Sequence, residues 1–470
     1  MIGEIVPKVI GLFLLPVFTV YLSPEDYGIM SYTESIAVFM YVFSVLSLNS
    51  YLLRNYFEIS SETEKKKFIG NLFVFVASYN VVVLLVFSAV LSIVFKVMEI
   101  QVDFFPYMFL ALLTNFFNIF SVIPMALYRI QEKAEKFVWL SLISTFLQII
   151  LSLLLIITFD QGVLGRYYGI LIVSILFAGV YFNLMRKEVI FNFNYQQIRE
   201  ALKFSLPLVP ASLSFLLLDI SDRLILEQYV SLKEMGIYSI AYTLGFAVNV
   251  VISGGYKAFE PILFKNLYQE NFIRTYYDIK NIFLFFVFSI GLLFLLFSQE
   301  ILYIMATADF YEAYILVPII VIAAAIKGLY MLYGVLMMAK RKTKMLSMAV
   351  VLGALVNIGI NIMFIPTYGI IAAAISTVFG FLIMTLFIHI AVYPYFRLNL
   401  YHDIKDYISI LLLSLIGYLV FYFYNVELEL CIETFVMKSI IFGIGVLLFS
   451  KIYKVAMFKN IKKLFVKSLR

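Results

Sequence analysis

The sequence predicts an all-α integral membrane protein with about fourteen transmembrane helices, forming two pseudo-symmetric six-helix lobes and two extra carboxyl-terminal helices. Three observations predict this class: an apolar composition, apolar runs of membrane length, and a motif that occurs in both halves of the chain. Of the 470 residues, 63% are hydrophobic and only 14% are charged, with a mean hydropathy of +1.00. Because soluble domains carry about 25% charged residues, this composition excludes a water-soluble fold.

The apolar runs are bounded by charged residues, proline or glycine, and most have the length that a bilayer demands. A helix needs about 20 predominantly apolar residues to cross the hydrocarbon core. Fourteen runs fit this description: 2–22, 28–53, 68–95, 104–127, 137–159, 165–185, 204–226, 236–256, 282–305, 313–338, 345–365, 369–392, 407–424 and 435–453.

The positions of the lysines and arginines support this division and give an orientation. With the amino terminus inside, the inner ends and connections hold 29 of them, and the outer connections hold only Lys96, Arg166 and Lys233. Cytoplasmic loops of membrane proteins carry such an excess of cations. We therefore expect a multi-pass membrane protein with both termini in the cytoplasm.

A repeated motif predicts two related lobes. Tyr, Ser, Gly, Ile and Ser coincide between 21–31 and 229–239 at an offset of 208, and 162–165 resembles 369–372 at an offset of 207. Because six helices separate the copies, the lobes share one orientation, as in the parallel repeats of transporters. The predicted organisation is an N-lobe at 1–186, a cytoplasmic linker at 187–203, a C-lobe at 204–395, and helices 13 and 14 with a basic tail at 396–470.

Charged residues inside the predicted spans are the candidate functional residues, because a charge at bilayer depth costs at least about 2.5 kcal/mol unless it meets water or a partner. Lys327 lies near the middle of the tenth run with no acid within a helical turn, so it lines a cavity or pairs with another helix. Asp219, Asp222 and Arg223 lie in the seventh run, where a ligand or ion site and an internally paired ladder are both open readings.

Two further charged residues stand at other depths. Glu34, in the outer half of the second run, is a carboxylate that could couple transport to H⁺ or Na⁺, together with Asp219 and Asp222, or simply bond a neighbouring helix. Arg54 ends the same run on the inner side, where it meets a phosphate or extends to the interface. Six amides, among them Asn118, Gln148 and Asn357, either bind sugar hydroxyls or join helices.

Several classes of protein are excluded or disfavoured. One cysteine, Cys431, and two histidines, His389 and His402, rule out a disulfide framework and a Cys/His zinc cluster. No Gly-x4-Gly-Lys-Ser/Thr phosphate loop occurs, which argues against ATP hydrolysis. We expect no metal or other cofactor, and no nucleic-acid partner, since the cations that give the net charge of +6 follow the membrane topology.

The motif at Pro16–Gly28, its counterpart at Gly236–Ala241, and Asp222-Arg223 resemble the Wzx-type flippases of bacterial polysaccharide biosynthesis. These belong to the multidrug/oligosaccharidyl-lipid/polysaccharide exporter superfamily. The resemblance implies a two-lobe exporter that moves undecaprenyl-diphosphate-linked oligosaccharide to the outer leaflet by alternating access, without enzymatic chemistry. It also implies a cationic central cavity, for which Lys327, Arg223 and Arg54 are the candidates.

The expected product is an O-antigen (lipopolysaccharide), capsule or exopolysaccharide. The expected partners are the lipid-linked substrate, membrane lipids, and a polysaccharide polymerase with its chain-length machinery. Three alternatives remain open from the residues: a peptidoglycan-precursor flippase, a drug/cation antiporter of the same superfamily, and, more remotely, a membrane glycan polymerase or acyltransferase.

Overall fold

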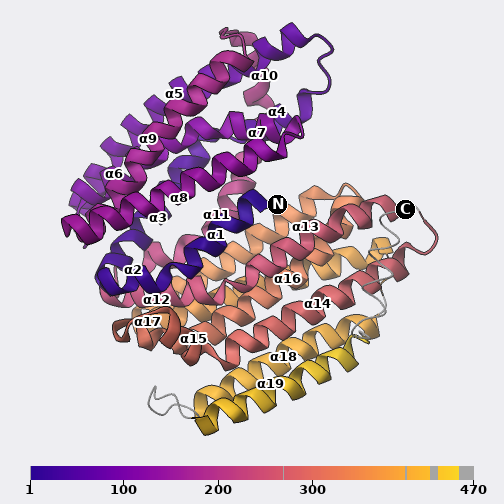
Figure 1. Ribbon diagram of the computed structural model, residues 1–470. Helices are drawn as coiled ribbons and strands as arrows, with labels where there is room; N and C mark the ends of the chain where they lie inside the picture. Colours follow the sequence, from indigo (N-terminus) through magenta and orange to yellow (C-terminus); the bar gives the residue numbers. More distant parts are fainter. Residues whose placement is uncertain (1, 268, 397, 399, 424–431, 455–470) are drawn as a thin grey trace. The chain divides into compact units, whose positions relative to one another are not determined.

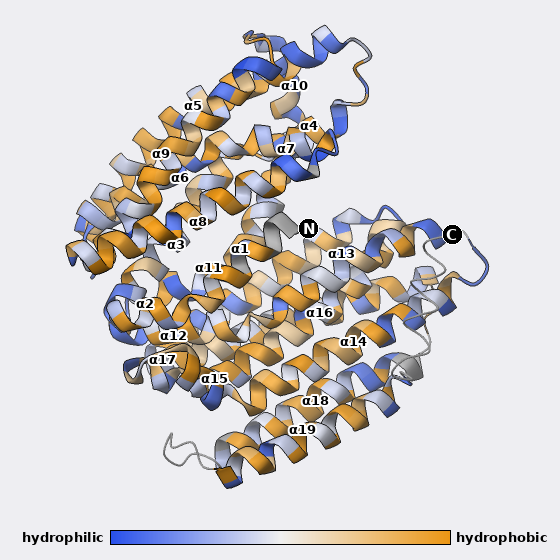
Figure 2. Ribbon diagram, in the orientation of Figure 1, coloured by the Kyte–Doolittle hydropathy of each residue, from blue (hydrophilic) through white to orange (hydrophobic). Residues whose placement is uncertain are grey.

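The computed structural model describes residues 2–267, 269–396, 398, 400–423 and 432–454, and all of its secondary structure in this part is helical (Figure 1). The chain divides into two compact units. The N-unit comprises Ile2–Ile10 and Val17–Gly236, and the C-unit comprises Gly11–Pro16 and Ile237–Arg470. Figure 2 shows hydrophobic residues along most of the helices and hydrophilic ones around α10 (Tyr195–Ser205), as expected for helices that cross a bilayer.

The helices of the N-unit include three short segments of tighter or wider winding. In chain order they are α1 (Ile2–Phe13), α2 (Leu15–Tyr21), α3 (Pro24–Val45), α4 (Leu48–Asn55), α5 (Glu62–Val97), η1 (Phe104–Met108), α6 (Phe109–Asn118), η2 (Ile119–Ser121), α7 (Val122–Ile130), α8 (Ala134–Phe159), α9 (Gly162–Glu188), α10, η3 (Leu206–Leu208) and α11 (Val209–Leu226). Helix α1 extends by its last residues into the C-unit.

The C-unit contains the remaining helices, of which α12 begins in the N-unit. They are α12 (Leu232–Gly245), α13 (Val248–Asn266), α14 (Phe272–Leu296), α15 (Ser298–Met305), η4 (Ala308–Ile315), α16 (Val317–Ala339), α17 (Thr343–Phe396), α18 (Leu400–Phe423) and α19 (Ile432–Ile452). Its most enclosed spans are α14 and α16, which are each 72% buried over their apolar windows.

Ten helices of the described part are long and apolar enough to cross a membrane, and a bent pair raises the number to eleven. The expected count of fourteen is therefore not confirmed, although the multi-pass, all-helical class is. The first and thirteenth expected runs correspond to α1–α2 and α18, which are not among the ten. The seventh corresponds to the pair bent by 49° near Pro207 and Pro210, which lack the backbone donors of a straight helix.

Helix α17 is a hairpin of two arms rather than one rod. Its 54 residues contain a break at Gly369, where φ is +54° and ψ is −132°. Gly353 packs against the backbone of Gly380, and Asn357 bonds Ser376, so the two arms run antiparallel. The expected runs at 345–365 and 369–392 are thus separate arms.

Helices α8 and α9 form a similar antiparallel hairpin in the N-unit. Gly165 packs against Ile156, and Gly169 against Ser152. The turn ends at Gly162, where φ is +51°. The second mark of the repeat therefore has a structural meaning, because Gly162 and Gly369 both adopt a positive φ at the start of a returning helix.

The first mark of the repeat is a pair of matching helix starts that touch each other. Ser23 and Asp26 form a capping box, and Ser231 and Glu234 make the same exchange of side-chain-to-backbone hydrogen bonds, at 2.9–3.2 Å. A Cβ on Gly28 would collide with the carbonyl of Leu232, and a Cβ on Gly236 would collide with that of Pro24. The two copies thus approach each other reciprocally, each through its glycine.

The division into two compact units falls after Gly236 and places α10 and α11 in the N-unit, whereas the cytoplasmic linker at 187–203 stays a prediction. The predicted lobes remain a prediction about internal symmetry. Of the predicted basic tail, the part beyond Lys454 lies outside the described residues, as does Cys431.

Candidate functional site

Lys327, the cation expected near the middle of a span, lies in α16 between two aromatic rings of the C-unit. Its ammonium nitrogen is 5.1 Å from the centroid of Phe246 and 5.0 Å from that of Phe381. The side chain is partly exposed. Because ring faces are negative, such a site stabilises a cation by about 0.5–2 kcal/mol without neutralising it.

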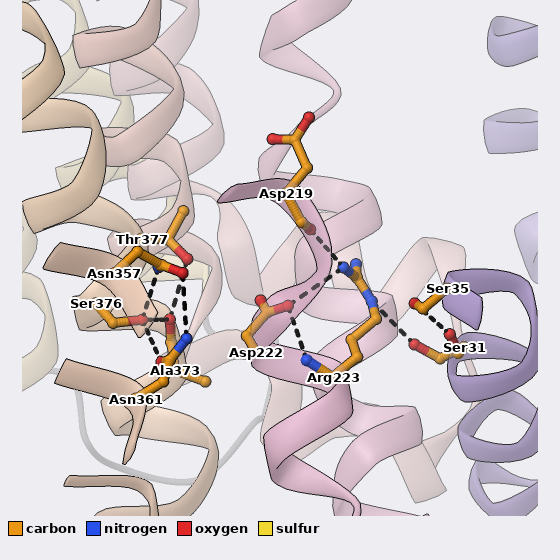
Figure 3. Close-up of polar contacts among 10 residues, drawn as sticks. All are labelled: Ser31, Ser35, Asp219, Asp222, Arg223, Asn357, Asn361, Ala373, Ser376 and Thr377. Carbon is orange, nitrogen blue, oxygen red and sulfur yellow. Dashed lines mark hydrogen bonds and ion pairs between the residues drawn. The ribbon is translucent and has the colours of Figure 1, made fainter. Parts of the chain in front are cut away.

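Arg223 is nearly buried and joins α11 to α3 within the N-unit (Figure 3). Its Nε donates to the Ser31 hydroxyl at 3.0 Å, and its Nη1 donates to the Asp219 carbonyl at 2.8 Å. Nη1 also lies 3.5 Å from the carboxylate of Asp222, which is itself 2% exposed. The guanidinium is thus held in a network of protein groups, and its role toward a substrate remains a prediction.

The acids near Arg223 make different contacts. Figure 3 shows the Asp219 carboxylate pointing away from the guanidinium, so the Asp219 contact that we describe is through its backbone. Glu227, which would continue the ladder, accepts a hydrogen bond from the backbone of Gln101 at 2.6 Å. Burial raises the pKa of the Glu227 carboxyl, and this hydrogen bond opposes the rise.

The other two charged candidates are exposed. The guanidinium carbon of Arg54 lies 4.9 Å from the ring centroid of Phe204, which fits a side chain that extends along an apolar surface. Glu34 makes no hydrogen bond or ion pair within the described residues. The structure places Arg54, Glu34 and the Arg223 network in the N-unit, and Lys327 in the C-unit.

Some of the candidate amides are structural. Asn357 donates to Ser376 at 3.0 Å and accepts from Asn361 at 3.2 Å, and Ser376 donates to Asn361 at 2.5 Å (Figure 3). All three are fully buried. This closed cluster holds the two arms of α17 together. Asn115 likewise donates to the backbone of Ala37.

Two other amides, Asn118 and Gln148, line a cavity of about 480 Å³ in the N-unit. Its wall is rich in hydroxyl and amide side chains from the ends of α6 and η2 and from α8: Asn118, Ser121, Ser141, Ser144, Thr145 and Gln148. Ser174, Phe177 and Tyr181 of α9 complete one side. The volume is within the range of roughly 300–1,000 Å³ that is usual for small-molecule sites.

The hydroxyl residues of α8 in this cavity are a feature that the sequence analysis missed. Ser141, Ser144, Thr145 and Gln148 are spaced i, i+3, i+4 and i+7, which places them on one face of a helix. The neighbouring Ile143, Phe146 and Ile150 are exposed on the outside of the unit. This spacing in an apolar run was the signal that could have found the cavity.

Buried charge pairs were also missed, because the sequence gives charges but not their partners. Lys280 of α14 lies 2.5 Å from both Asp403 and Asp406 of α18. His389 lies 3.3 Å from Asp403 and is stacked on Tyr333. Lys438 of α19 pairs with Glu300 at 2.7 Å. These pairs attach α18 and α19 to the rest of the C-unit.

Comparison with known proteins identifies the family. The model of the family described as "Polysaccharide biosynthesis protein" matches residues 1–267, more than half of the chain. The chain belongs to this family. A relative from Haemophilus influenzae (strain ATCC 51907 / DSM 11121 / KW20 / Rd), named "Uncharacterized membrane protein", is 22% identical over 281 residues. The match covers 57% of this chain and 64% of that relative, just under two thirds of its length.

Solved structures similar to this polysaccharide biosynthesis family member are transporters. "Lipid II flippase MurJ, inward closed conformation" has a TM-score of 0.72 at 20% identity, over 96% of this chain and 98% of that one. An inward-facing "multidrug resistance MATE family transporter of the MOP superfamily" has a TM-score of 0.65 at 13% identity, over 84% and 94%. The chain therefore has the same fold as these two proteins, which is the fold that the resemblance implied.

The described residues contain no group of three or more His, Cys, Asp or Glu side chains that could hold a metal ion. Lys327 with its two rings, the Arg223 network and the cavity along α8 are candidate functional features among the described residues.

Proposed function

We propose that this protein is a flippase that moves undecaprenyl-diphosphate-linked oligosaccharide repeat units from the inner to the outer leaflet of the bacterial cytoplasmic membrane. Both of its termini are cytoplasmic, and it alternates between inward-open and outward-open states. The repeat units are those of an O-antigen, capsule or exopolysaccharide, which a polymerase and its chain-length machinery then extend.

The observation that carries this proposal is the aromatic site of Lys327 in a polysaccharide biosynthesis family member with an exporter fold. A lipid diphosphate is an anion that must cross a medium of low dielectric constant, where the attraction of a single cation is strong. The two rings hold the lysine in place, and we propose that its ammonium meets the diphosphate. Arg223 and Arg54 are the additional cations of the proposal.

The experiment that tests it compares Lys327→Ala with Lys344→Ala in cells whose surface glycan depends on this protein. Lys344 is an exposed lysine at the start of α17, so its loss removes the same charge without touching the site. We expect surface glycan to fall at least about tenfold in Lys327→Ala and to stay normal in Lys344→Ala, since a lost charge-assisted contact costs about 1.5–3 kcal/mol.

Membrane levels of both variants, measured by immunoblot, control for folding. Normal surface glycan in Lys327→Ala would contradict the proposed role of this residue. In a strain that lacks the protein, finished repeat units should accumulate on the inner leaflet, whereas loss of a polymerase leaves them outside. Repeat units found on the outer leaflet of that strain would count against flipping itself.

A second candidate function, flipping of the peptidoglycan precursor, is favoured by one observation: the similarity to the lipid II flippase extends over 96% of the chain. The two functions differ in their consequence for the cell. Loss of a peptidoglycan-precursor flippase stops growth, whereas loss of a surface-glycan flippase leaves viable cells without the glycan. A drug/cation antiporter would instead show as drug sensitivity in the deletion strain.

The proposal includes coupling to H⁺ or Na⁺ through Glu34, Asp219 and Asp222. Glu34 is its most accessible acid and has no hydrogen-bond partner in the described structure. Glu34→Gln, which keeps the shape but removes the charge, should abolish the dependence of flipping on an imposed ion gradient in proteoliposomes. Gradient dependence equal to that of the wild type would remove Glu34 from the coupling site.

A further inference from the structure

We propose that the polar cavity along α8 binds the saccharide part of the transported molecule, leaving its charged diphosphate to other residues. This inference rests on the proposed function and goes beyond it by assigning a neutral sugar site to the N-unit. The cavity has about 480 Å³ of space, and none of the residues that line it is charged. A site without charge suits the neutral part of a lipid-linked oligosaccharide better than its diphosphate.

Three hydroxyl groups of the cavity residues already donate their protons to backbone carbonyls. The Ser121 hydroxyl donates to the carbonyl of Asn118 at 2.6 Å, and Ser144 and Thr145 donate to the carbonyl of Ser141 at 3.0 and 2.9 Å. Each of these hydroxyl oxygens therefore keeps lone pairs that can accept a hydrogen bond. They are acceptors for the hydroxyl groups of a sugar.

The donors come from the two amides. The Ser174 hydroxyl lies 2.8 Å from both the Asn118 side-chain oxygen and the Ile170 carbonyl, and the NH₂ group of Asn118 makes no hydrogen bond within the described residues. Gln148 makes no hydrogen bond with any residue of the described structure, and its amide lines the cavity. An amide offers both a donor and an acceptor, as does each sugar hydroxyl.

Aromatic side chains form one side of the same cavity. Phe177 and Tyr181 belong to the lining, and their ring centroids lie 6.0 Å apart. The apolar C–H face of a pyranose ring can pack against such rings, while its hydroxyl edge meets the hydroxyl and amide groups. Aromatic and polar groups together fit a saccharide better than they fit a hydrocarbon chain.

Close helix packing is the other reason for small polar residues in a membrane helix, and the structure locates that packing elsewhere. Helix α9 approaches α8 closely at Gly165 and Gly169, which face Ile156 and Ser152. The cavity residues Ser141 to Gln148 precede that contact by one or more turns. They are not needed to bring the helices together.

The test uses the full-length protein in nanodiscs and two lipid probes. The first probe is the lipid-linked oligosaccharide extracted from a strain that lacks the protein, and the second is undecaprenyl diphosphate without sugar. In the double variant Gln148→Leu, Thr145→Val, we expect the affinity for the oligosaccharide lipid to fall about tenfold and that for undecaprenyl diphosphate to change less than about twofold.

The matched control is Ser92→Ala. Ser92 is an exposed serine of α5 whose hydroxyl donates to the carbonyl of Ala89, like the back-bonded hydroxyls of the cavity. It should leave both affinities unchanged. Equal losses for the two probes, or no loss, in the double variant would overturn the sugar site while the proposed function stands. If the wild type binds neither probe, the proposed function itself fails.

A labelling experiment tests the site without removing its hydrogen bonds. In a Cys431→Ser background, which has no other cysteine, Met125→Cys should react with a hydrophilic maleimide and be protected by the oligosaccharide lipid but not by undecaprenyl diphosphate, because the apolar Met125 side chain lines the same cavity. Leu147→Cys, on the exposed face of α8, should show no specific protection. Protection of both positions by both lipids would contradict a sugar site.

Discussion

The hairpin of α8 and α9 and the hairpin formed by the two arms of α17 contain the same kinds of polar residue and use them differently. Each begins its second helix at a glycine of positive φ, Gly162 or Gly369. In α17, Asn357, Asn361 and Ser376 bond one another with no exposure. In α8, the corresponding kinds of group line a cavity, and their hydrogen-bond capacity is only partly used within the protein.

The difference shows how to interpret serine, threonine and amide residues in membrane helices. A polar group that is fully buried needs a partner within the protein, because an unmade hydrogen bond there costs about 1–3 kcal/mol. A group that lines a cavity can exchange bonds with water or ligand. The residue types are the same, and only the surroundings separate structure from binding.

The largest expected effect is on the stability of the α17 hairpin, which we call the closed hairpin because its polar groups are buried. The hairpin of α8 and α9, whose polar groups line a cavity, is the open hairpin. Asn357→Leu removes the two hydrogen bonds that Asn357 makes with Ser376 and Asn361 in a buried place and should lower the free energy of unfolding by about 2–4 kcal/mol. Gln148→Leu in the open hairpin should change it by less than about 0.5 kcal/mol. Thermal unfolding of the two variants in the same detergent measures the contrast, and equal melting temperatures would refute it.

A smaller effect is expected from adding a methyl group between the helices of each hairpin. Gly169→Ala would bring a Cβ against the Ser152 backbone, and Gly353→Ala would bring one against the carbonyl of Gly380. We expect a loss of about 1–3 kcal/mol in each. Gly179→Ala and Gly359→Ala, on the same helices with nothing within 4 Å, are the controls and should be neutral or slightly stabilising. Similar losses at all four positions would mean that helix contact is not the cause.

The smallest effect compares two threonines that make the same backbone bond. Thr377 donates to the carbonyl of Ala373 at 3.0 Å in the closed hairpin, and Thr145 donates to that of Ser141 at 2.9 Å in the open one. Replacement of Thr377 by valine should cost about 0.5–1.5 kcal/mol of stability, since its bond is buried. The stability of Thr145→Val should stay unchanged within error, while its binding of the oligosaccharide lipid weakens.

Much of the fold follows from apolar run length and charge, because a bilayer allows few solutions to the backbone hydrogen-bond problem. The turn at Gly369 was placed correctly from glycine and proline alone, whereas the number of spans was not confirmed. The surroundings of the candidate site residues were harder to predict from the sequence than the fold. Lys327 could be found because an isolated charge in an apolar run has few explanations, but its aromatic neighbours Phe246 and Phe381 are far away in sequence.

Contacts between residues that are far apart in the sequence could not be predicted. The local sequence does not show that Lys280 pairs with Asp403 and Asp406. It also does not show that Asn357 is buried and hydrogen-bonded whereas Gln148 lines a cavity. The sequence predicted that the amides either bind sugar hydroxyls or join helices, without deciding between these two roles. Their separation required the burial and the hydrogen bonds of each one.

The reciprocal contact of Gly28 with Leu232 and Gly236 with Pro24 has the geometry of an isologous interface, in which one surface patch meets its own copy. In a homodimer, such a contact forms only when two molecules collide, and it depends on concentration. Here both copies belong to one chain, so covalent connection supplies an effective concentration that dilution cannot reduce. A substitution at either glycine therefore disturbs the same contact, so the two copies of the motif constrain each other's sequence.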